Sequence, residues 1–319
     1  MHLIAKAPAK VNLCLLVGPG RSDGYHELFS VFAPLDMHDE LLFTLEVGDQ
    51  GGAPGALDVS CPALDDDSLC GPNLVERALR ALEGITGRAI EGEVQIGKAI
   101  PIGAGLGGGS SDAAVALKAG ARLLAEEGGI VLDEVALHHI ARGLGADVPF
   151  FLGHGPALGR GIGDLLEPVS LPVIPLVVLL PEEVLGTAEV YKTYDGLVEA
   201  QDLETFSSRA AGAQEAWRGL ASEWSGHDMA EAALSEVVEY IAARLENDLE
   251  LASFNLLPHL AERKQDLLDA GAAGALMSGS GPTVFGLCRS LEEAQAVCRA
   301  LQALGCSARC AVTVTGASA

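Results

Sequence analysis

Basic residues are scarce in this sequence: 20 Lys and Arg stand against 44 Asp and Glu, for a formal net charge of −24. A surface this acidic repels nucleic-acid backbones and anionic lipid headgroups, which argues against a DNA-coating or membrane-surface role. The same field repels small anionic substrates. A phosphate site therefore has to be built locally, from backbone N–H groups and a few well-placed cations.

Long apolar runs are also missing. The most apolar stretch, residues 169–180, is interrupted by Pro172 and Pro175 and is well short of the ~20 apolar residues that a membrane span needs. A short apolar stretch near the N-terminus is split by Asn12, and no A-x-A cleavage site follows it. We therefore expect neither a membrane span nor an export signal.

Paired cysteines are absent too. The chain has seven cysteines, an odd number, without a C-x-x-C pair or metal-ligand spacing. This pattern predicts reduced thiols that serve mostly as small buried apolar side chains, in a cytoplasmic protein. The cysteines are Cys14, Cys61, Cys70, Cys288, Cys298, Cys306 and Cys310.

Length and composition predict a folded chain of two domains. At roughly 150 residues per domain, 319 residues are enough for two, and a hydrophobic content of 49% excludes a disordered chain. Strands and helices are mixed in both halves without regular alternation, which favours the α+β class. We expect an N-terminal domain over residues 1–156 and a C-terminal domain over residues 157–319.

Hydrophobic periodicity and turn residues predict where the elements lie. Asn73 stands where a helix cap belongs. Residues 48–72 are typical of a surface excursion around a short strand, and residues 202–232 of a loosely organised helix or insertion. Strands are expected over 11–17, 41–47, 93–98, 176–180, 273–277, 283–288 and 308–314, and helices over 74–82, 110–127, 133–144, 231–245, 260–270 and 291–304.

A glycine-rich segment is the strongest chemical signal. Five glycines occupy the seven positions 103–109, between an expected strand and a helix opened by Ser110, Ser111 and Asp112. Such a segment exposes several backbone N–H groups where the helix dipole is positive, which is how proteins bind phosphate. A purely structural turn needs only one or two glycines, so an anion site is the better interpretation.

Three phosphate-binding interpretations compete for this segment. Residues 103–108 match the dinucleotide fingerprint, but the acidic residue about 20 positions on ends a helix instead of a second strand. Residues 92–99 nearly match a Walker A loop, yet Ala99 lacks the hydroxyl that binds Mg²⁺, and the stretch alternates like a strand. The third interpretation is a kinase whose glycine loop covers nucleotide phosphates without a Walker lysine.

Two further stretches bear on this choice. Lys10 stands at the mouth of an expected strand, and the sequence DGYHE at residues 23–27 lies in the following turn. A lone lysine is usually solvated, and a lone Asp-Gly is usually only a turn. Asp147 is set among apolar residues directly after a helix. It can simply cap or turn the chain, but an apolar setting also favours a functional carboxylate.

Taken together, these stretches resemble the GHMP kinase superfamily. The blocks, in chain order, are PAKVN, DGYHE, PIGAGLGGGSSDAA, GADVPFF and SGSGPTVFG. DGYHE and the long GLGGGSS point within the superfamily to the kinases that phosphorylate a cytidine-diphosphate-linked methylerythritol on the non-mevalonate route to isoprenoids. The resemblance runs from residue 4 to about residue 316.

The resemblance implies a two-domain α+β fold: an N-terminal ribosomal-protein-S5-like domain with the glycine loop, and a C-terminal ferredoxin-like domain. It also implies an active site between the domains and an ATP-dependent transfer to the 2-hydroxyl of the acceptor, with Mg²⁺ bridging the phosphates. The expected partners are these small molecules, with no nucleic acid, membrane or obligate protein partner.

Carried over residue by residue, the resemblance makes Asp147 the catalytic acid/base and places Lys10 between it and the acceptor hydroxyl. Asn12 also reaches the reacting end. Tyr25 stacks on the cytosine, His26 reads its hydrogen-bonding edge, and Tyr191 is the second aromatic face. Residues 278–283 resemble the motif that supports the glycine loop. The ATP loop is Pro101, Ile102, Gly103, Ala104, Gly105, Leu106, Gly107, Gly108, Gly109, Ser110 and Ser111.

Two alternatives stay open at this point. Within the superfamily, the chain can be a homoserine, galactose or mevalonate-type kinase, although DGYHE argues against this. Outside enzymes, it can be a non-catalytic nucleotide-binding protein, although the presence of both Lys10 and Asp147 argues against that.

Overall fold

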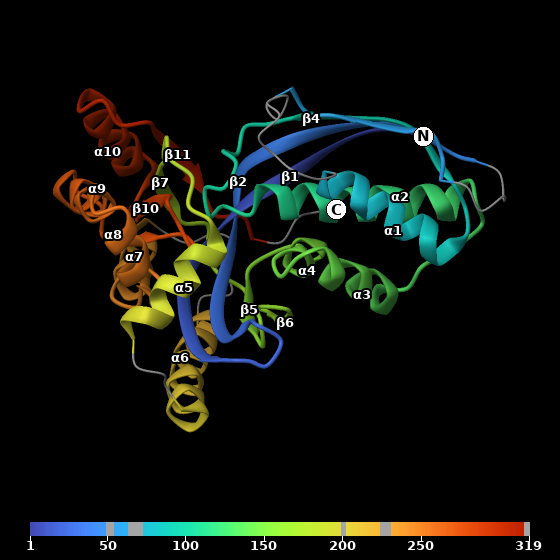
Figure 1. Ribbon diagram of the computed structural model, residues 1–319. Coiled ribbons are helices and arrows are strands. Elements are labelled where there is room, and N and C mark those ends of the chain that lie inside the picture. Colours follow the sequence, from blue (N-terminus) through green and yellow to red (C-terminus); the bar gives the residue numbers. More distant parts are fainter. Residues whose placement is uncertain (49–53, 63–72, 199–201, 224–230, 316–319) are drawn as a thin grey trace. The chain divides into compact units, whose positions relative to one another are not determined.

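The computed structural model describes residues 1–48, 54–62, 73–198, 202–223 and 231–315. The chain forms two compact units, each built from segments that alternate along the sequence (Figure 1). Strands β1 (His2–Gly20) and β2 (His26–Val47) each contribute to both units. The α+β class is confirmed, while the division into domains at residue 156 stays a prediction. Unit 1 is Met1–Ala9, Met37–Ile100 and Gly107–Gly153, and unit 2 is Lys10–Asp36, Pro101–Leu106 and His154–Ala319.

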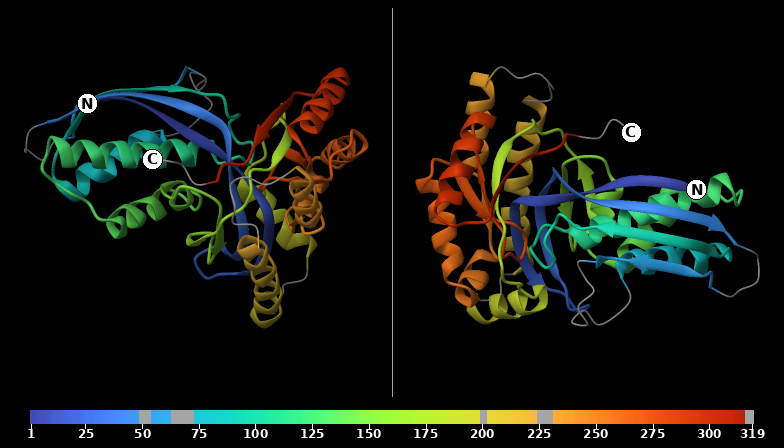
Figure 2. Two further views of the ribbon diagram at one scale, coloured as in Figure 1. Left: turned by 180° about the vertical axis from the view of Figure 1, so that it is seen from behind. Right: turned by 90° about the horizontal axis from the view of Figure 1, so that it is seen from above.

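Unit 1 is a sheet covered on one face by two helices, α1 and α2 (Figure 2). Its strands are hydrogen-bonded in the order β3-β4-β2-β1, with β4 antiparallel to β2 and parallel to β3. Helices α1 and α2 pack closely, because Gly120 on α2 leaves room for Leu79 and Leu82 on α1. The remaining elements of unit 1 are β3 (Leu57–Ser60), α1 (Leu74–Thr86), β4 (Ile90–Gly97), α2 (Gly108–Glu126), α3 (Glu134–Leu144) and α4 (Val148–Leu152).

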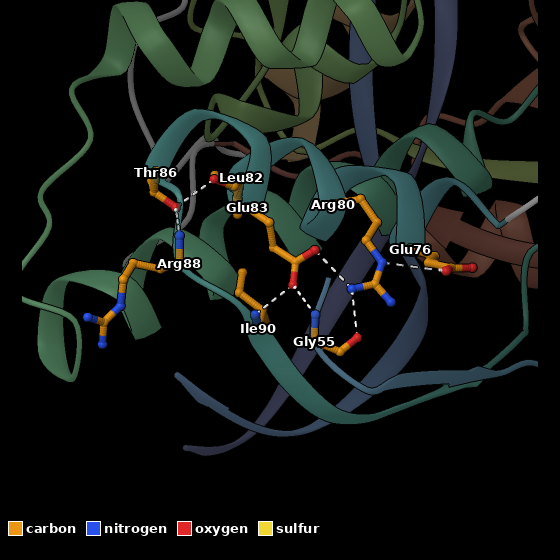
Figure 3. A network of polar contacts seen from close by, with 8 residues as sticks. All are labelled: Gly55, Glu76, Arg80, Leu82, Glu83, Thr86, Arg88 and Ile90. Atoms are coloured by element: carbon orange, nitrogen blue, oxygen red, sulfur yellow. Dashed lines mark hydrogen bonds and ion pairs between the residues drawn. The ribbon is translucent and has the colours of Figure 1, made fainter. Parts of the chain in front are cut away.

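Helix α1 is fixed at both ends by side-chain hydrogen bonds. Asn73 accepts a hydrogen bond from the Val75 N–H, so the predicted cap is confirmed. Near the other end, the Glu83 carboxylate accepts hydrogen bonds from the N–H groups of Gly55 (3.1 Å) and Ile90 (2.7 Å) (Figure 3). Arg80 bonds both Glu83 and the Gly55 carbonyl. This network ties the beginning of β4 and the segment before β3 to the helix.

Unit 2 contains its part of the first sheet and a second, four-stranded antiparallel sheet. In the first, β8 pairs in parallel with β1, and β5 joins β2 to β6. The second has the order β11-β7-β10-β9 and packs its apolar face against α9 and α10. The remaining elements of unit 2 are β5 (Ala157–Arg160), β6 (Leu165–Pro168), β7 (Pro175–Leu179), α5 (Thr187–Leu197), α6 (Leu203–Glu223), α7 (Glu231–Ala242), β8 (Glu246–Asn247), α8 (Glu250–Leu256), α9 (His259–Asp269), β9 (Gly274–Met277), β10 (Val284–Leu287), α10 (Leu291–Ala303) and β11 (Ala308–Val312).

Several expectations for the strands need correction. The strand expected over residues 41–47 begins much earlier, at His26, as β2. The strand expected over residues 11–17 extends over the whole of β1, so Lys10 lies within a strand and not at its mouth. Strand β5 lies in a segment for which the sequence analysis expected no strand. The expectation for residues 202–232 is met in part by α6, while residues 224–230 lie outside the described residues.

The described parts of the chain contain no helix long and apolar enough to cross a membrane. Six cysteines are described, none of them forms a disulfide with another described cysteine, and four of them are buried. Burial raises the pKa of Cys14 and of Cys288 to about 12, which makes both thiols poor nucleophiles. Cys70 lies outside the described residues.

Candidate active site

Lys10 is a buried cation in the middle of β1. It is 3% exposed, and its Nζ donates a 2.6 Å hydrogen bond to the Asn12 side-chain oxygen. Residues two apart on a strand point to the same face, which brings these two side chains together. Asn12 in turn donates to Ser30 Oγ (2.7 Å), which donates to the Cys14 carbonyl (2.8 Å). This relay of hydrogen bonds positions the ammonium group.

The first part of the glycine loop lies against the turn at residues 278–283, as the resemblance implied. Ser278 Oγ donates to the Gly105 carbonyl (3.0 Å), and the Thr283 N–H donates to the Ala104 carbonyl (3.3 Å). Gly105 has φ +75°, and a Cβ there would lie 2.3 Å from the Ser278 carbonyl oxygen. Only glycine satisfies both the backbone angle and this close approach.

Lys10 also lies against both the glycine loop and the turn 278–283. Its N–H donates to the Leu106 carbonyl at 2.9 Å. Its Nζ lies 3.2 Å from the point where a Cβ on Gly279 would stand. The side chain of Asn247 supports the turn by donating to the Met277 and Gly279 carbonyls, at 2.8 Å each. Within unit 2, the structure therefore brings together Lys10, Asn12, the loop segment 101–106 and the turn 278–283.

The second part of the loop belongs to unit 1 and begins helix α2. Gly107 is the N-cap residue, with φ +71°, and no side chain caps the helix there. The N–H groups of the first turn of a helix have no partner within the helix, so they face outward as hydrogen-bond donors. Ser111 lies in this turn, and its fully buried hydroxyl has no hydrogen-bond partner among the described residues. The segment has the donors that a phosphate site needs.

A buried charge cluster of Asp39, Lys98 and Asp112 underlies this first turn. Lys98 Nζ bonds both carboxylates, and its contact with Asp112 Oδ2 is 2.8 Å. Asp39 also accepts hydrogen bonds from the N–H groups of Ala99 (2.6 Å) and Ile100 (2.9 Å). The cluster therefore ties the segment that leads into the loop to the helix that follows it.

Burial dominates the electrostatics of Asp112 in this cluster. It raises the pKa of Asp112 to about 6, and Lys98 offsets the effect only in part. The Asp112 Oδ1 atom is buried and has no hydrogen-bond partner among the described residues.

Asp147 is the N-cap residue of the short helix α4 in unit 1. Its carboxylate does not make the usual capping hydrogen bond to the helix. It is half-buried, and the four residues that follow it, 148–151, are buried. The apolar setting predicted for this carboxylate is confirmed, and its catalytic role stays a prediction.

The residues expected to bind cytosine lie together in unit 2. Tyr25 is at the tip of the turn between β1 and β2 and is 53% exposed. Next to it, the largely buried His26 ring stacks on Tyr191, with 5.1 Å between centroids and 29° between planes. A fourth residue, Asp195, contacts His26 Nε2 at 2.8 Å.

Sequence reasoning missed the roles of Asp39, Lys98 and Asp195. Lys98 stood in the rejected Walker-like stretch, and Asp39 in a strand with no motif. Asp195 had a usable signal, because residues four apart on a helix share a face and Tyr191 was already a candidate.

The chain is similar to known kinases in sequence and in structure. Residues 73–155 match the profile of the GHMP kinases N terminal domain, and residues 229–305 match that of the GHMP kinases C terminal. A crystal structure of 4-(cytidine 5'-diphospho)-2C-methyl-D-erythritol kinase is similar, with a TM-score of 0.68 and 34% identity, over 98% of this chain and 100% of that chain. Homoserine kinase from Cytophaga hutchinsonii shares the fold, with a TM-score of 0.67 and 22% identity over 99% of this chain and 95% of its own.

Two curated relatives extend the match over nearly the whole chain. The 4-diphosphocytidyl-2-C-methyl-D-erythritol kinase of Geobacter metallireducens is 38% identical over 301 residues, which cover 94% of each chain. The kinase of the same name from Pelotomaculum thermopropionicum is 39% identical over 299 residues, or 93% of each chain. Identity at this level and coverage shows that the chain belongs to the GHMP kinases and, within them, to the 4-diphosphocytidyl-2-C-methyl-D-erythritol kinase family.

Proposed function

We propose that this enzyme transfers the γ-phosphoryl group of ATP to the 2-hydroxyl of 4-diphosphocytidyl-2-C-methyl-D-erythritol, a step of the non-mevalonate isoprenoid pathway. The observation that carries the proposal is the buried Lys10 ammonium, held by Asn12 beside the glycine loop and the turn 278–283. A cation buried among backbone groups at a phosphate loop is suited to neutralise charge during phosphoryl transfer. Because ATP is the donor, we place the reaction in the cytoplasm.

The glycine loop, residues 101–111, would hold the ATP phosphates. The N–H groups at the start of α2 and the dipole of this 19-residue helix favour an anion there. The buried Ser111 hydroxyl, which has no partner among the described residues, is suited to donate to a phosphate oxygen. Because these donors and the helix dipole act at short range, the loop can bind phosphate although the chain has a net charge of −24.

Mg²⁺ fits this site as a companion of ATP. No group of three or more His, Cys, Asp or Glu side chains in the described parts of the chain can hold a metal ion. Phosphate oxygens and water would therefore supply most of its ligands, as is usual for Mg²⁺ bound with a nucleotide. When bound, the ion would neutralise charge on the phosphates.

Lys10 and Asp147 would share the work on the acceptor hydroxyl. The Lys10 ammonium orients the hydroxyl oxygen and neutralises charge that develops on the transferring phosphoryl group. The Asp147 carboxylate takes the hydroxyl proton, late in a loose transition state. Asn12 acts through Lys10, because its side-chain oxygen accepts the Lys10 hydrogen bond. Most of the rate gain would come from alignment and charge neutralisation.

Tyr25, His26 and Tyr191 would bind the cytosine. Tyr25 offers an exposed ring at the tip of the β1–β2 turn, and stacking on a base is worth ~1–3 kcal/mol per ring. Tyr191 already packs on the His26 ring, so its contribution to the base site includes holding that ring. Discrimination between cytosine and uracil needs a hydrogen bond to the base edge, which is the role we assign to His26.

An ADP-release assay with three acceptors tests the proposal. The cytidyl substrate should be phosphorylated at its 2-hydroxyl, as seen by ³¹P NMR, while mevalonate and homoserine should give only background ADP release. Turnover of mevalonate or homoserine, with none of the cytidyl substrate, would overturn it.

A matched pair of variants tests the role of Asp147. Asp147→Asn should lower the single-turnover rate by roughly 10²- to 10⁴-fold with little change in ATP affinity. Asp133 caps α3 in the same unit through its side chain, and Asp133→Asn should retain the wild-type rate. If Asp147→Asn stays within about threefold of wild type, Asp147 is not a catalytic residue.

A further inference from the structure

Asp195 contacts the side chain that is proposed to read the cytosine. It lies on α5, four residues after Tyr191, so both side chains project from one face of the helix. Tyr191 stacks on the His26 ring, and Asp195 Oδ1 lies 2.8 Å from His26 Nε2. One helix therefore makes two different contacts with one imidazole ring.

The position of Asp195 is set by the anchoring of α5. Val190 and Tyr194, on the neighbouring face of the helix, are buried in a core cluster with Leu249. At the start of the helix, Thr187 Oγ1 lies 3.0 Å from Ser280 Oγ. Because the helix is held along one side and at its N-terminus, the carboxylate stays within reach of the ring.

The two contacts fix different properties of the His26 ring. Stacking on Tyr191 restrains the plane of the ring. The hydrogen bond to Asp195 decides which nitrogen carries the proton, because a carboxylate only accepts hydrogen bonds. Nε2 must therefore be the protonated nitrogen, and in the neutral ring Nδ1 is left as an acceptor.

An acceptor at Nδ1 is complementary to cytosine and not to uracil at one position of the base. Cytosine carries an amino group at C4, which donates, whereas uracil carries a carbonyl oxygen there, which only accepts. A ring with the opposite tautomer would present a donor and suit the uracil carbonyl. The tautomer of His26 would therefore decide whether cytosine or uracil is preferred.

We propose that Asp195 is a specificity-determining positioning residue, which fixes the tautomer of His26 and so favours cytidine over uridine nucleotides. This inference rests on the proposed function, in which His26 reads the base. It requires no contact between Asp195 and the substrate.

Electrostatics alone makes the opposite prediction for the loss of Asp195. The substrate carries a diphosphate, so removing a nearby negative charge should strengthen the binding of cytidine and uridine nucleotides alike. The proposal instead predicts weaker binding of the cytidine nucleotide alone. Glu189, an exposed acidic residue on the same helix, provides the matched control, because Glu189→Gln removes a charge without touching His26.

The experiment measures CDP and UDP affinities by calorimetry for wild type, Asp195→Ala, Asp195→Glu and Glu189→Gln, together with kcat and KM for the cytidyl acceptor. For Asp195→Ala, the preference for CDP should fall roughly tenfold, with KM raised and kcat unchanged. Asp195→Glu should restore part of the preference, and Glu189→Gln should keep all of it. Loss of fold at α5 would weaken both nucleotides equally, so the ratio separates positioning from a structural role.

A spectroscopic measurement without substrate reports on the tautomer itself. In ¹⁵N-histidine-labelled enzyme, with His26→Gln used for assignment, the His26 Nε2–H signal should be protected in wild type and lost to water exchange in Asp195→Ala. An unchanged CDP preference in Asp195→Ala, or an unprotonated Nε2 in wild type, would overturn the role of Asp195. A wild type that prefers CDP but does not phosphorylate the cytidyl acceptor would instead overturn the proposed function.

Discussion

The buried cluster of Asp39, Lys98 and Asp112 leads to a prediction about stability and pH. The Asp112 side chain is 5% exposed, and burial raises its pKa from 3.8 to about 6. The Asp112 carboxyl therefore binds a proton more tightly in the native protein than in the unfolded chain. Protonation thus adds to the unfolding free energy at low pH, and this contribution is lost as the pH rises through the interval between those two pKa values. Asp112→Asn removes the titrating group and, with it, this pH dependence.

The expected magnitude follows from the two pKa values. A difference of about two pKa units corresponds to about 3 kcal/mol of unfolding free energy over the full interval. Only part of this change in unfolding free energy can be measured in solution, because the sequence pI is near 4.5 and the protein is least soluble near that pH. Between pH 5.0 and pH 7.5, linkage with these values gives a loss on the order of 1 kcal/mol.

Urea unfolding of both proteins at pH 5.0 and pH 7.5 measures this term. The unfolding free energy of wild type should fall with pH by roughly 1 kcal/mol more than that of Asp112→Asn, since titrating groups outside the cluster cancel in the difference. Asp133→Asn, at an exposed cap in the same unit, should show the wild-type dependence. A difference of zero would show that attraction to Lys98 balances burial, and a wild type that gains relative stability with rising pH would show that attraction outweighs it; either result would refute the reasoning.

Three shorter predictions concern the loop, the lysine and the α1 network. Lys10→Met keeps the apolar stem and removes the charge, so single-turnover rates should fall by roughly 10²- to 10⁴-fold with ATP affinity nearly unchanged; a wild-type rate would exclude a role in transfer. Gly105→Ala places a Cβ 2.3 Å from the Ser278 carbonyl oxygen and should weaken ATP binding, measured by calorimetry, by more than about tenfold. The control variant Gly109→Ala, whose Cβ would have its nearest contact at 3.6 Å, should bind ATP normally. Glu83→Gln should lower the unfolding free energy in urea by about 1–3 kcal/mol, because two backbone N–H groups lose a charged acceptor; a loss below about 0.5 kcal/mol would contradict this.

The sequence predicted the elements whose patterns are local. Asn73 caps α1 because its side chain accepts from a nearby N–H, which is a property of the residue and its neighbours. The sequence did not predict β5, because Gly159 weakens the strand pattern. In the structure, a Cβ on Gly159 would lie 2.5 Å from the Phe32 ring, so the glycine is required by a contact between distant segments.

Helix α6 is a second element that depends on contacts between distant segments, in this case in a polar stretch of sequence. Its sequence is rich in Ala, Ser and Glu and has a weak apolar pattern. In the structure Phe206 and Trp217 are nearly fully buried, and Arg209 bonds Asp248 and Glu246. Phe206 fits because Gly18 on β1 has no side chain, which no local reading of residues 202–232 reveals.

For the site, the residues that a motif names were predictable, and so were partners close to them in the sequence, whereas distant partners were not. The resemblance named Lys10, Asn12 and His26 but not Asp195; in the structure Asn12 accepts a hydrogen bond from Lys10, and Asp195 contacts His26. Asn12 lies two residues from Lys10 on the same strand, so its contact follows from strand geometry alone. Asp195 is 169 residues from His26, and only the packing of α5 against the core brings them together. Short-range partners of a motif residue can therefore be inferred from periodicity, whereas long-range partners such as Asp195 require the fold.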